Sequence, residues 1–193
     1  MIVIGLTGSF GTGKSTVAGM FRKKGAVVLD ADKTAHALIG KNGKCAKAVI
    51  KTFGTNNRRK LAAIVFNDAR DLNKLTRIVH PAVSKEFGKA INDYRKGGKV
   101  KAVVMDVPLL FEAGMDRLAD VTLTVKAGRK EQIVRAARRF KITPAQVHKR
   151  IKNQMPLSKK ISLSDIIIDN RGSLADTQKQ VNAIWNKLNK RYT

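Results

Sequence analysis

The stretch that most constrains this chain is GSFGTGKS, residues 8–15, which satisfies the pattern G-x-x-x-x-G-K-[ST] in full. An apolar run precedes it, and the apolar residues of STVAGMFRK follow at helical spacing. Glycines in this pattern let backbone N–H groups turn inward around phosphate oxygens, and the positive end of the following helix attracts the same anion. The stretch therefore predicts a strand, a phosphate-binding loop and a helix, with a nucleoside triphosphate as ligand.

Six residues of this loop are expected to bind the phosphates: Gly11, Thr12, Gly13, Lys14, Ser15 and Thr16. The Lys14 ammonium would bridge the β- and γ-phosphates, and the Ser15 hydroxyl would ligate Mg²⁺. The alternative is an unoccupied glycine-rich turn. The order of strand, loop and helix disfavours that alternative.

Short apolar runs alternate with helical patterns along the rest of the chain. The strand candidates are Ile2–Leu6, Ala26–Leu29, Val100–Met105, Val121–Val125 and Asp165–Ile168. Strands this apolar are typical of a sheet that is buried on both faces. The alternation predicts an α/β fold with a five-stranded parallel sheet flanked by helices.

Two intervals are too long for simple connections between parallel strands. Residues 33–99 contain no convincing strand and predict a helical insertion, because apolar residues recur there at helical spacing. These residues are Val83, Phe87, Ile91 and Tyr94. The second interval, 126–161, holds twelve Lys or Arg and a single acid, Glu131. We expect one domain over residues 1–193, with a core at about 1–32, 100–125 and 162–193.

Helix start signals follow in the second half of the chain. Thr143 is an expected N-cap, with Pro144 at the first helical position and Gln146 at the third. Ser173 is the expected cap of a terminal helix. The inner stripe of that helix is expected at Val181, Trp185 and Leu188.

The chain carries 39 Lys or Arg against 14 Asp or Glu, a formal net charge of +25. Such an excess favours anionic partners, whether nucleotides, nucleic acid or acidic membrane surfaces. A single cysteine, Cys45, excludes an intrachain disulfide framework and suits a reducing compartment. The start of the chain lacks the basic region of a signal peptide, and the longest apolar run, 102–111, is too short to span a bilayer. We therefore expect a cytoplasmic protein without a membrane partner.

Two carboxylates, Asp30 and Asp32, follow the second predicted strand within VVLDADKTAH. Open α/β sheets bind ligands at the carboxyl ends of their strands, so either carboxylate can meet a hydroxyl acceptor or a metal near the γ-phosphate. The alternative for Asp32 is that it caps a helix over residues 33–39. The two roles are compatible.

A third carboxylate, Asp106, ends the apolar strand of VVMDVPLLFEAG. We expect Asp106 at this position to order Mg²⁺ through water beside the phosphates. Pro108 should end the strand, because its nitrogen has no hydrogen to donate. Glu112 follows in a turn and is either an outer contact of the site or a solvated acid.

Together these motifs resemble those of the dephospho-CoA kinases, P-loop kinases of coenzyme A biosynthesis. The resemblance covers almost the full length, in the family's order: GLTGSFGTGKST, DADKTAH, LAAIVFND followed by IVHPAV, DVPLLFEAG, QIVRAARR and SDIIIDNRGS. Phe10 stands where an aliphatic residue is usual, and the net charge is unusually high. The resemblance implies a P-loop NTPase-type sheet with a helical substrate-binding insertion, about 33–99, and a helical lid, about 126–161.

The activity that the resemblance implies is transfer of the ATP γ-phosphoryl group to the ribose 3′-hydroxyl of dephospho-CoA, with Mg²⁺ as cofactor. By motif match, Asp32 orients or deprotonates that hydroxyl, and Asp30 is the alternative carboxylate. A carboxylate near the loop can accept the proton, although positioning and charge neutralisation supply most of the rate.

The resemblance also implies binding residues outside the loop. The lid would reach the transferring phosphates through Arg139 first and Arg135 second, the alternative being a solvated basic face. In the insertion, Arg77 and His80 would contact dephospho-CoA, although a histidine before proline is as often a structural cap. Asn170 would lie near the adenine of ATP, or serve only as a turn residue.

Two other functions compete with this interpretation. Another P-loop kinase, acting on a nucleoside or nucleotide, would share the loop and lid but leave DADKTAH and IVHPAV unexplained. A nucleic-acid-binding ATPase would account for the charge, but aromatic residues make up only 5% of the chain and do not interleave with basic ones. We expect no specific nucleic-acid partner, and nucleic-acid binding driven by the charge alone would be incidental.

Overall fold

The computed structural model describes residues 1–65 and 68–192. Phe66 and Asn67, which belong to the LAAIVFND stretch, lie outside the described residues. The strands are β1 (Ile2–Gly8), β2 (Val27–Asp30), β3 (Ala102–Asp106), β4 (Val121–Lys126) and β5 (Ile166–Asp169). The helices are α1 (Lys14–Lys23), α2 (Ala31–Ile39), α3 (Ala46–Phe53), α4 (Arg58–Val65), α5 (Ala69–Gly97), α6 (Arg129–Phe140), α7 (Pro144–Lys152), α8 (Leu157–Leu163) and α9 (Leu174–Tyr192), with a short 3₁₀ helix, η1 (Met115–Leu118).

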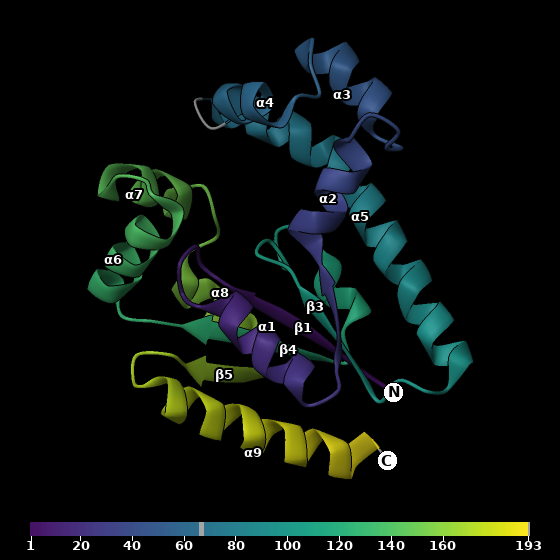
Figure 1. Ribbon diagram of the computed structural model, residues 1–193, viewed down its shortest axis with the longest axis vertical. Helices are drawn as coiled ribbons and strands as arrows, with labels where there is room; N and C mark the ends of the chain where they lie inside the picture. Colours follow the sequence, from purple (N-terminus) through teal and green to yellow (C-terminus); the bar gives the residue numbers. More distant parts are fainter. Residues whose placement is uncertain (66–67, 193) are drawn as a thin grey trace. The chain divides into compact units, whose positions relative to one another are not determined.

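In the described ranges, the strands form one five-stranded parallel sheet in the order β2-β3-β1-β4-β5 (Figure 1). The central strand is β1, whose Ile4 lies beside Val104 of β3 and Val121 of β4. All of β1 is buried, as a strand covered on both faces requires. The predicted α/β fold is confirmed, with β1 extended to Gly8 and β3 starting at Ala102.

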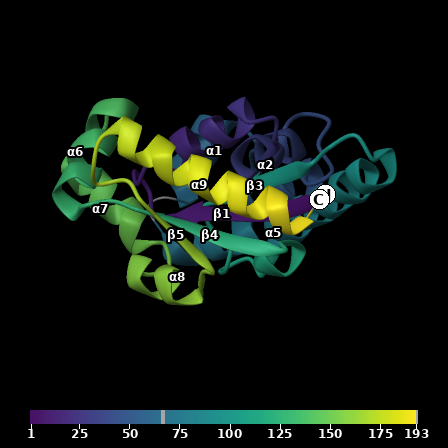
Figure 2. The same cartoon turned by 90° about the horizontal axis from the view of Figure 1, so that it is seen from below.

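The two faces of the sheet are covered by different helices. Helices α1 and α9 pack on one face, and α8 lies on the other (Figure 2). The expected inner stripe of the terminal helix is confirmed, because Val181, Trp185 and Leu188 are all buried in the core. The ring of Phe21 in α1 lies 6.3 Å from that of Trp185, so aromatic packing joins the first and last helices.

The expected helix starts are also confirmed. The Thr143 hydroxyl accepts the Gln146 N–H, and the Gln146 side chain accepts the Thr143 N–H at 3.0 Å, which completes a capping box. The Asp176 N–H donates to the Ser173 hydroxyl at 3.1 Å at the start of α9. Both helices begin where a side chain replaces the missing backbone acceptor.

Contacts between residues divide the chain into two compact units. One is Met1–Leu29 with the chain from Ile91 onward, and the other is Asp30–Ala90. Apart from Asp30, which ends β2, the described residues of the second unit form no strand, and Val83 and Phe87 are buried at the helical spacing read from the sequence. This helical content agrees with an insertion, while its role as a binding region stays a prediction.

The two longest helices are α5, with 29 residues, and α9, with 19. Both carry charged side chains along their length. No helix in the described part of the chain combines the length and apolar character that crossing a membrane needs.

Removing the Phe21 ring should destabilise the fold strongly. Phe21 is fully buried between the sheet and Trp185, so Phe21→Ala is expected to lower the free energy of unfolding by about 3–5 kcal/mol. Leu174→Ala is the control, because Leu174 is 65% exposed, and its effect should stay within about 0.5 kcal/mol. Urea denaturation measures both values, and equal losses in the two variants would contradict the assigned core.

Candidate active site

The phosphate-binding loop joins β1 to α1 and turns at two glycines. Gly11 has φ 86° and Gly13 has φ 92°, backbone angles that residues with a Cβ rarely adopt. A Cβ on Gly11 would also lie 2.8 Å from the Ala136 Cβ, and one on Gly13 would collide with the Asn170 amide. Both glycines are therefore required by the backbone conformation and by the close packing around it.

Lys14 opens α1 and forms an ion pair with Asp106, the last residue of β3. Both side chains are largely buried, with 12% of the Lys14 side chain and 7% of the Asp106 side chain exposed. The expected end of β3 before Pro108 is confirmed, and the Val107 N–H donates to the Leu6 carbonyl at 2.9 Å. The structure thus brings together the two residues that the sequence assigned to phosphate and to metal.

Three side-chain amides hold the backbone of the loop. Gln132 of α6 donates to the Phe10 carbonyl at 2.6 Å, and the Phe10 N–H donates to Gln154 Oε1 at 2.8 Å. Asn170, which follows β5, donates to the Thr12 carbonyl at 2.8 Å and accepts from the Thr177 hydroxyl at 2.8 Å. In this structure the amide of Asn170 supports the loop, a contact that the sequence did not indicate.

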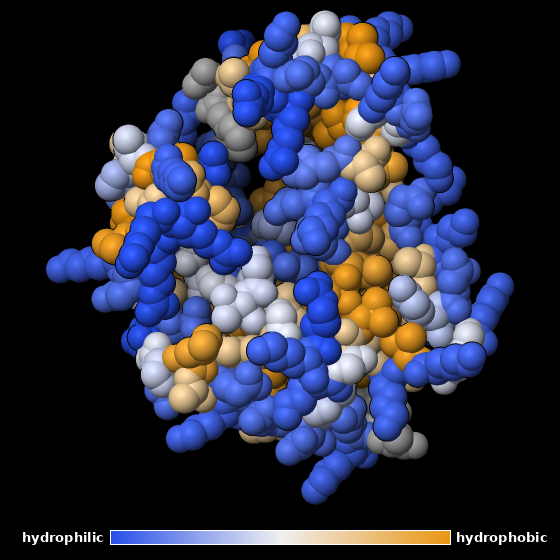
Figure 3. Space-filling view, in the orientation of Figure 1, coloured by the Kyte–Doolittle hydropathy of each residue, from blue (hydrophilic) through white to orange (hydrophobic). Residues whose placement is uncertain are grey.

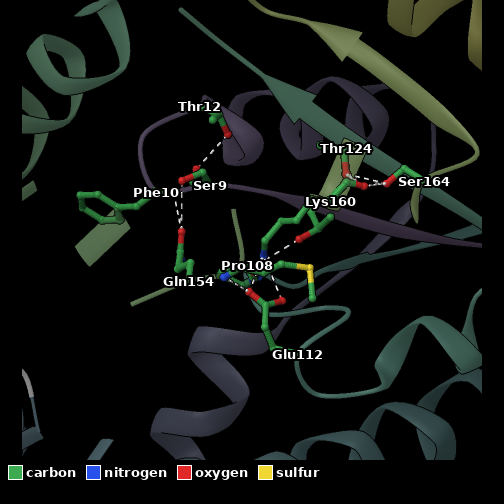
Figure 4. Close-up of polar contacts among 11 residues, drawn as sticks. Ser9, Phe10, Thr12, Pro108, Glu112, Thr124, Gln154, Lys160 and Ser164 are labelled. Atoms are coloured by element: carbon green, nitrogen blue, oxygen red, sulfur yellow. Dashed lines mark hydrogen bonds and ion pairs between the residues drawn. The ribbon is translucent and has the colours of Figure 1, made fainter. Parts of the chain in front are cut away.

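Figure 4 shows a lysine, Lys160, whose side chain points toward Pro108 and Glu112. The Lys160 side chain of α8 is completely buried, and its Nζ donates to the Pro108 carbonyl at 2.5 Å. Its ion pair with Glu112 has an N–O distance of 2.8 Å, and Glu112 also accepts the Met155 N–H at 2.9 Å. Glu112 is therefore a partner of a buried cation rather than a solvated acid.

Burial lowers the pKa of Lys160, because the charged form loses its hydration. The Glu112 carboxylate opposes this shift, and the positive charge of Lys14 adds to it. The protein therefore keeps two lysines within electrostatic reach of one another beside the loop. An anion bound at the loop would be stabilised by both charges.

The basic residues of α6 have different contacts. Arg135 donates to the Asn170 carbonyl at 3.1 Å, while the Arg139 guanidinium lies 5.6 Å from the centre of the Phe140 ring. Arg138 and Arg139 are both exposed. Hydrophilic side chains surround a few apolar ones over α6 and α7 in Figure 3.

In the second unit, Asp30 and Asp32 differ in position and contacts. Asp30 is the N-cap of α2, and its carboxylate accepts the Lys33 N–H at 3.0 Å. The alternative that Asp32 caps a helix over residues 33–39 is therefore wrong, because α2 begins at Ala31 and Asp32 lies in its first turn. Asp32 is exposed, and its carboxylate makes no hydrogen bond or ion pair with the described part of the chain.

Arg77 and His80 lie on α5, three residues apart and so on one side of the helix. Arg77 is exposed and His80 is half-buried. Pro81 lies inside α5, so His80 is not a helix cap.

Cys45 is buried with its Sγ 3.7 Å from the Ile78 carbonyl, and burial raises the pKa of its thiol.

The candidate ligands that the first unit offers to a divalent cation are oxygen atoms. Among the described residues, no cluster of three or more His, Cys, Asp or Glu could hold a metal ion. Mg²⁺ normally keeps several waters and binds one or two protein oxygens together with substrate phosphates, so such a cluster is not needed. The Ser15 hydroxyl and the Asp106 carboxylate fit that requirement.

Comparison with known proteins gives one consistent family. A family model described as dephospho-CoA kinase matches residues 2–176. The chain is 41% identical over 193 residues to a dephospho-CoA kinase of Symbiobacterium thermophilum, covering 96% of this chain and 80% of the relative. It is 38% identical to that of Lactobacillus johnsonii, covering 96% and 97%.

Solved structures agree on the fold. TT1252 from Thermus thermophilus has a TM-score of 0.80 at 32% identity, over 97% of each chain. A dephospho-CoA kinase from Campylobacter jejuni has a TM-score of 0.70 at 22% identity, over 99% of this chain and 98% of its own. A deoxyadenosine kinase from M. mycoides has a TM-score of 0.57 at 16% identity, over 98% and 100%, and at this identity it shares the fold alone.

The buried Lys160 should make stability depend on alkaline pH. Since its folded pKa is lowered below 10.5, the unfolded chain binds more protons between the two values, and the contribution of Lys160 to stability rises with pH there. Urea unfolding at a series of pH values below 10.5 should therefore show the stability of wild type rising with pH relative to that of Lys160→Met. Lys159→Met, an exposed neighbour on α8, should track wild type, and a constant offset for Lys160→Met would contradict the assignment.

Proposed function

The chain belongs to the dephospho-CoA kinase family, and we propose that it phosphorylates the ribose 3′-hydroxyl of dephospho-CoA with ATP through the residues assigned below. The observation that carries these assignments is the phosphate-binding loop with Lys14 and Asp106 paired at its end. The pair brings a lysine that can bind phosphate next to a carboxylate that can bind a metal ion. Both lie at the carboxyl ends of the strands, where α/β folds bind ligands.

In this proposal the 3′-oxygen attacks the γ-phosphorus, and the bond from that phosphorus to the β–γ bridging oxygen breaks to release ADP. The hydroxyl proton passes to Asp32, whose exposed carboxylate has no competing partner in the described chain. Lys14 balances the charge on the phosphate oxygens, and residues Gly11–Thr16 hold the triphosphate by their backbone. Positioning and charge neutralisation supply most of the rate.

Mg²⁺ fits this site through Ser15 and Asp106. When bound, it would neutralise charge on the β- and γ-phosphate oxygens. Asp106 is held by Lys14, which keeps the carboxylate beside the loop. A cytoplasmic, reducing location is consistent with the single buried cysteine.

The remaining assignments concern recognition. We assign Arg139 and Arg135 to the phosphates of ATP, supported by their place on α6, whose Gln132 binds the loop. Asn170 contributes to the ATP site by holding the Thr12 carbonyl. Arg77 and His80, on one side of α5, are assigned to dephospho-CoA. The bounds of the binding insertion, about 33–99, and of the lid, about 126–161, stay predictions.

An acceptor panel tests the proposed function. ADP release should be coupled to dephospho-CoA and be far slower with adenosine, deoxyadenosine or shikimate as acceptor. Equal rates with a nucleoside would favour a nucleoside kinase, and release that ignores every acceptor would indicate an ATPase.

Asp32→Asn should lower transfer to dephospho-CoA by roughly 10²- to 10⁴-fold, because asparagine has almost no proton affinity. ATP binding, measured by equilibrium titration, should change little, because the loop is intact. Asp30→Asn is the matched control, since asparagine also caps helices well and α2 should stay intact. Full activity of Asp32→Asn with loss in Asp30→Asn would move the role to Asp30, and full activity of both variants would contradict a carboxylate base at this position.

Arg139→Ala should lower turnover more than it weakens ATP binding, because a lid arginine acts mainly in the transition state. Steady-state kinetics and ATP titration separate the two effects. Lys190→Ala removes an exposed charge of α9 and is the control. If it caused the same loss of turnover, only bulk charge would matter.

A further inference from the structure

Phe10 lies in the phosphate-binding loop, and both its backbone N–H and its carbonyl are hydrogen-bonded by side chains from α6 and from the residues just after α7. Its carbonyl accepts from Gln132 of α6 at 2.6 Å. Its N–H donates to Gln154, just after α7, at 2.8 Å, and Gln154 also accepts from the Ser9 hydroxyl at 3.3 Å (Figure 4). The two ends of the α6–α7 segment therefore meet on one residue of the loop.

The Phe10 ring is held by the same segment. It stacks on Phe140, the last residue of α6, with ring centres 4.8 Å apart and planes inclined by 30°. The Arg150 guanidinium of α7 lies 5.1 Å from the centre of the Phe10 ring. At partly exposed sites, a stacked aromatic pair and an arginine–ring contact each contribute a modest stabilisation.

The loop also approaches α6 closely at Gly11, where a side chain would not fit. A Cβ on Gly11 would lie 2.8 Å from the Ala136 Cβ and 3.0 Å from the Gln132 carbonyl. Ala136 is buried on α6, one turn before Phe140. The close approach at Gly11 and the ring contacts of Phe10 thus act on the same helix.

We propose that Phe10 is a positioning residue that docks the α6–α7 segment on the phosphate-binding loop and so places the α6 arginines for phosphoryl transfer. The same helix carries Arg135 and Arg139, and a shift of α6 would move both. The proposal rests on the role assigned above to these arginines. A leucine in place of Phe10 would keep an apolar side chain but lose the stack and the guanidinium contact.

Phe10→Leu should therefore lower kcat about threefold to tenfold, the effect of one aromatic pair, while the Kd of ATP changes little. Amide hydrogen exchange over residues 129–152 should become faster, because the segment leaves the loop more often. Phe140→Leu should give the same two effects. The double variant should lose no more than the larger single loss, because the two rings act through one contact.

Arg150→Met tests the same ring without altering the loop, and Lys152→Met, an exposed cation on the same helix, is its control. Arg150→Met should lower kcat and speed amide exchange in the same way as Phe10→Leu, but to a smaller extent. Lys152→Met should match wild type in both measurements. The proposal would be overturned if the fold-loss of kcat in the Phe10 and Phe140 double variant equalled the product of the two single losses. It would also be overturned if amide exchange over residues 129–152 were unchanged in Phe10→Leu.

Failure of the arginine assignment gives a different pattern. Faster exchange in Phe10→Leu with unchanged kcat would overturn the positioning role while leaving the contact real. If Arg139→Ala also kept full turnover, the error would lie in the role assigned to the lid arginines. If Arg139→Ala lost turnover, the error would lie in the link from Phe10 to those arginines.

Discussion

The backbone between β1 and α1 has to reverse at Gly11 and Gly13 with positive φ, and the rest of the site depends on this turn. Glycine adopts such φ values readily, so a glycine-rich loop keeps one shape only where its surroundings hold it. Here the surroundings are three amides, Gln132, Gln154 and Asn170, which come from three separate segments of the chain. Their contacts keep the N-terminal end of α1 and Lys14 in place for phosphate.

Electrostatics at this site follow from burial of positive charge. The Lys14–Asp106 and Lys160–Glu112 pairs each combine one buried cation with one acid. Removing either acid would leave an uncompensated buried charge, which is costly. A bound polyphosphate adds negative charge next to both lysines, so ligand binding relieves their mutual repulsion. The net charge of +25 acts in the same direction over longer distances.

Much of the fold could be predicted from the sequence, because its signals are local. The strands, the loop and the caps at Thr143 and Ser173 depend on residues within a few positions of one another. The start of α2 was misplaced, since Asp30 and Asp32 are equally good caps by type and only the backbone distinguishes them.

The supports of the site could not be predicted in the same way. Gln132 and Gln154 contact a residue 122 and 144 positions away, and a glutamine in a basic segment is ordinarily solvated. Lys160 gives no sign of burial, because lysine is rarely buried at all. These partners become visible only once the sheet brings distant segments together. The assignments of Asp32, Arg77 and His80 still rest on motif resemblance.

The central claim is that the γ-phosphoryl group goes from ATP to a defined hydroxyl. Transfer of label from [γ-³²P]ATP in the presence of dephospho-CoA tests it most directly, with the position of the label determined in the product. The account predicts label on the ribose 3′-oxygen and almost none in inorganic phosphate. Label released mainly as inorganic phosphate, or found on a different hydroxyl, would contradict it.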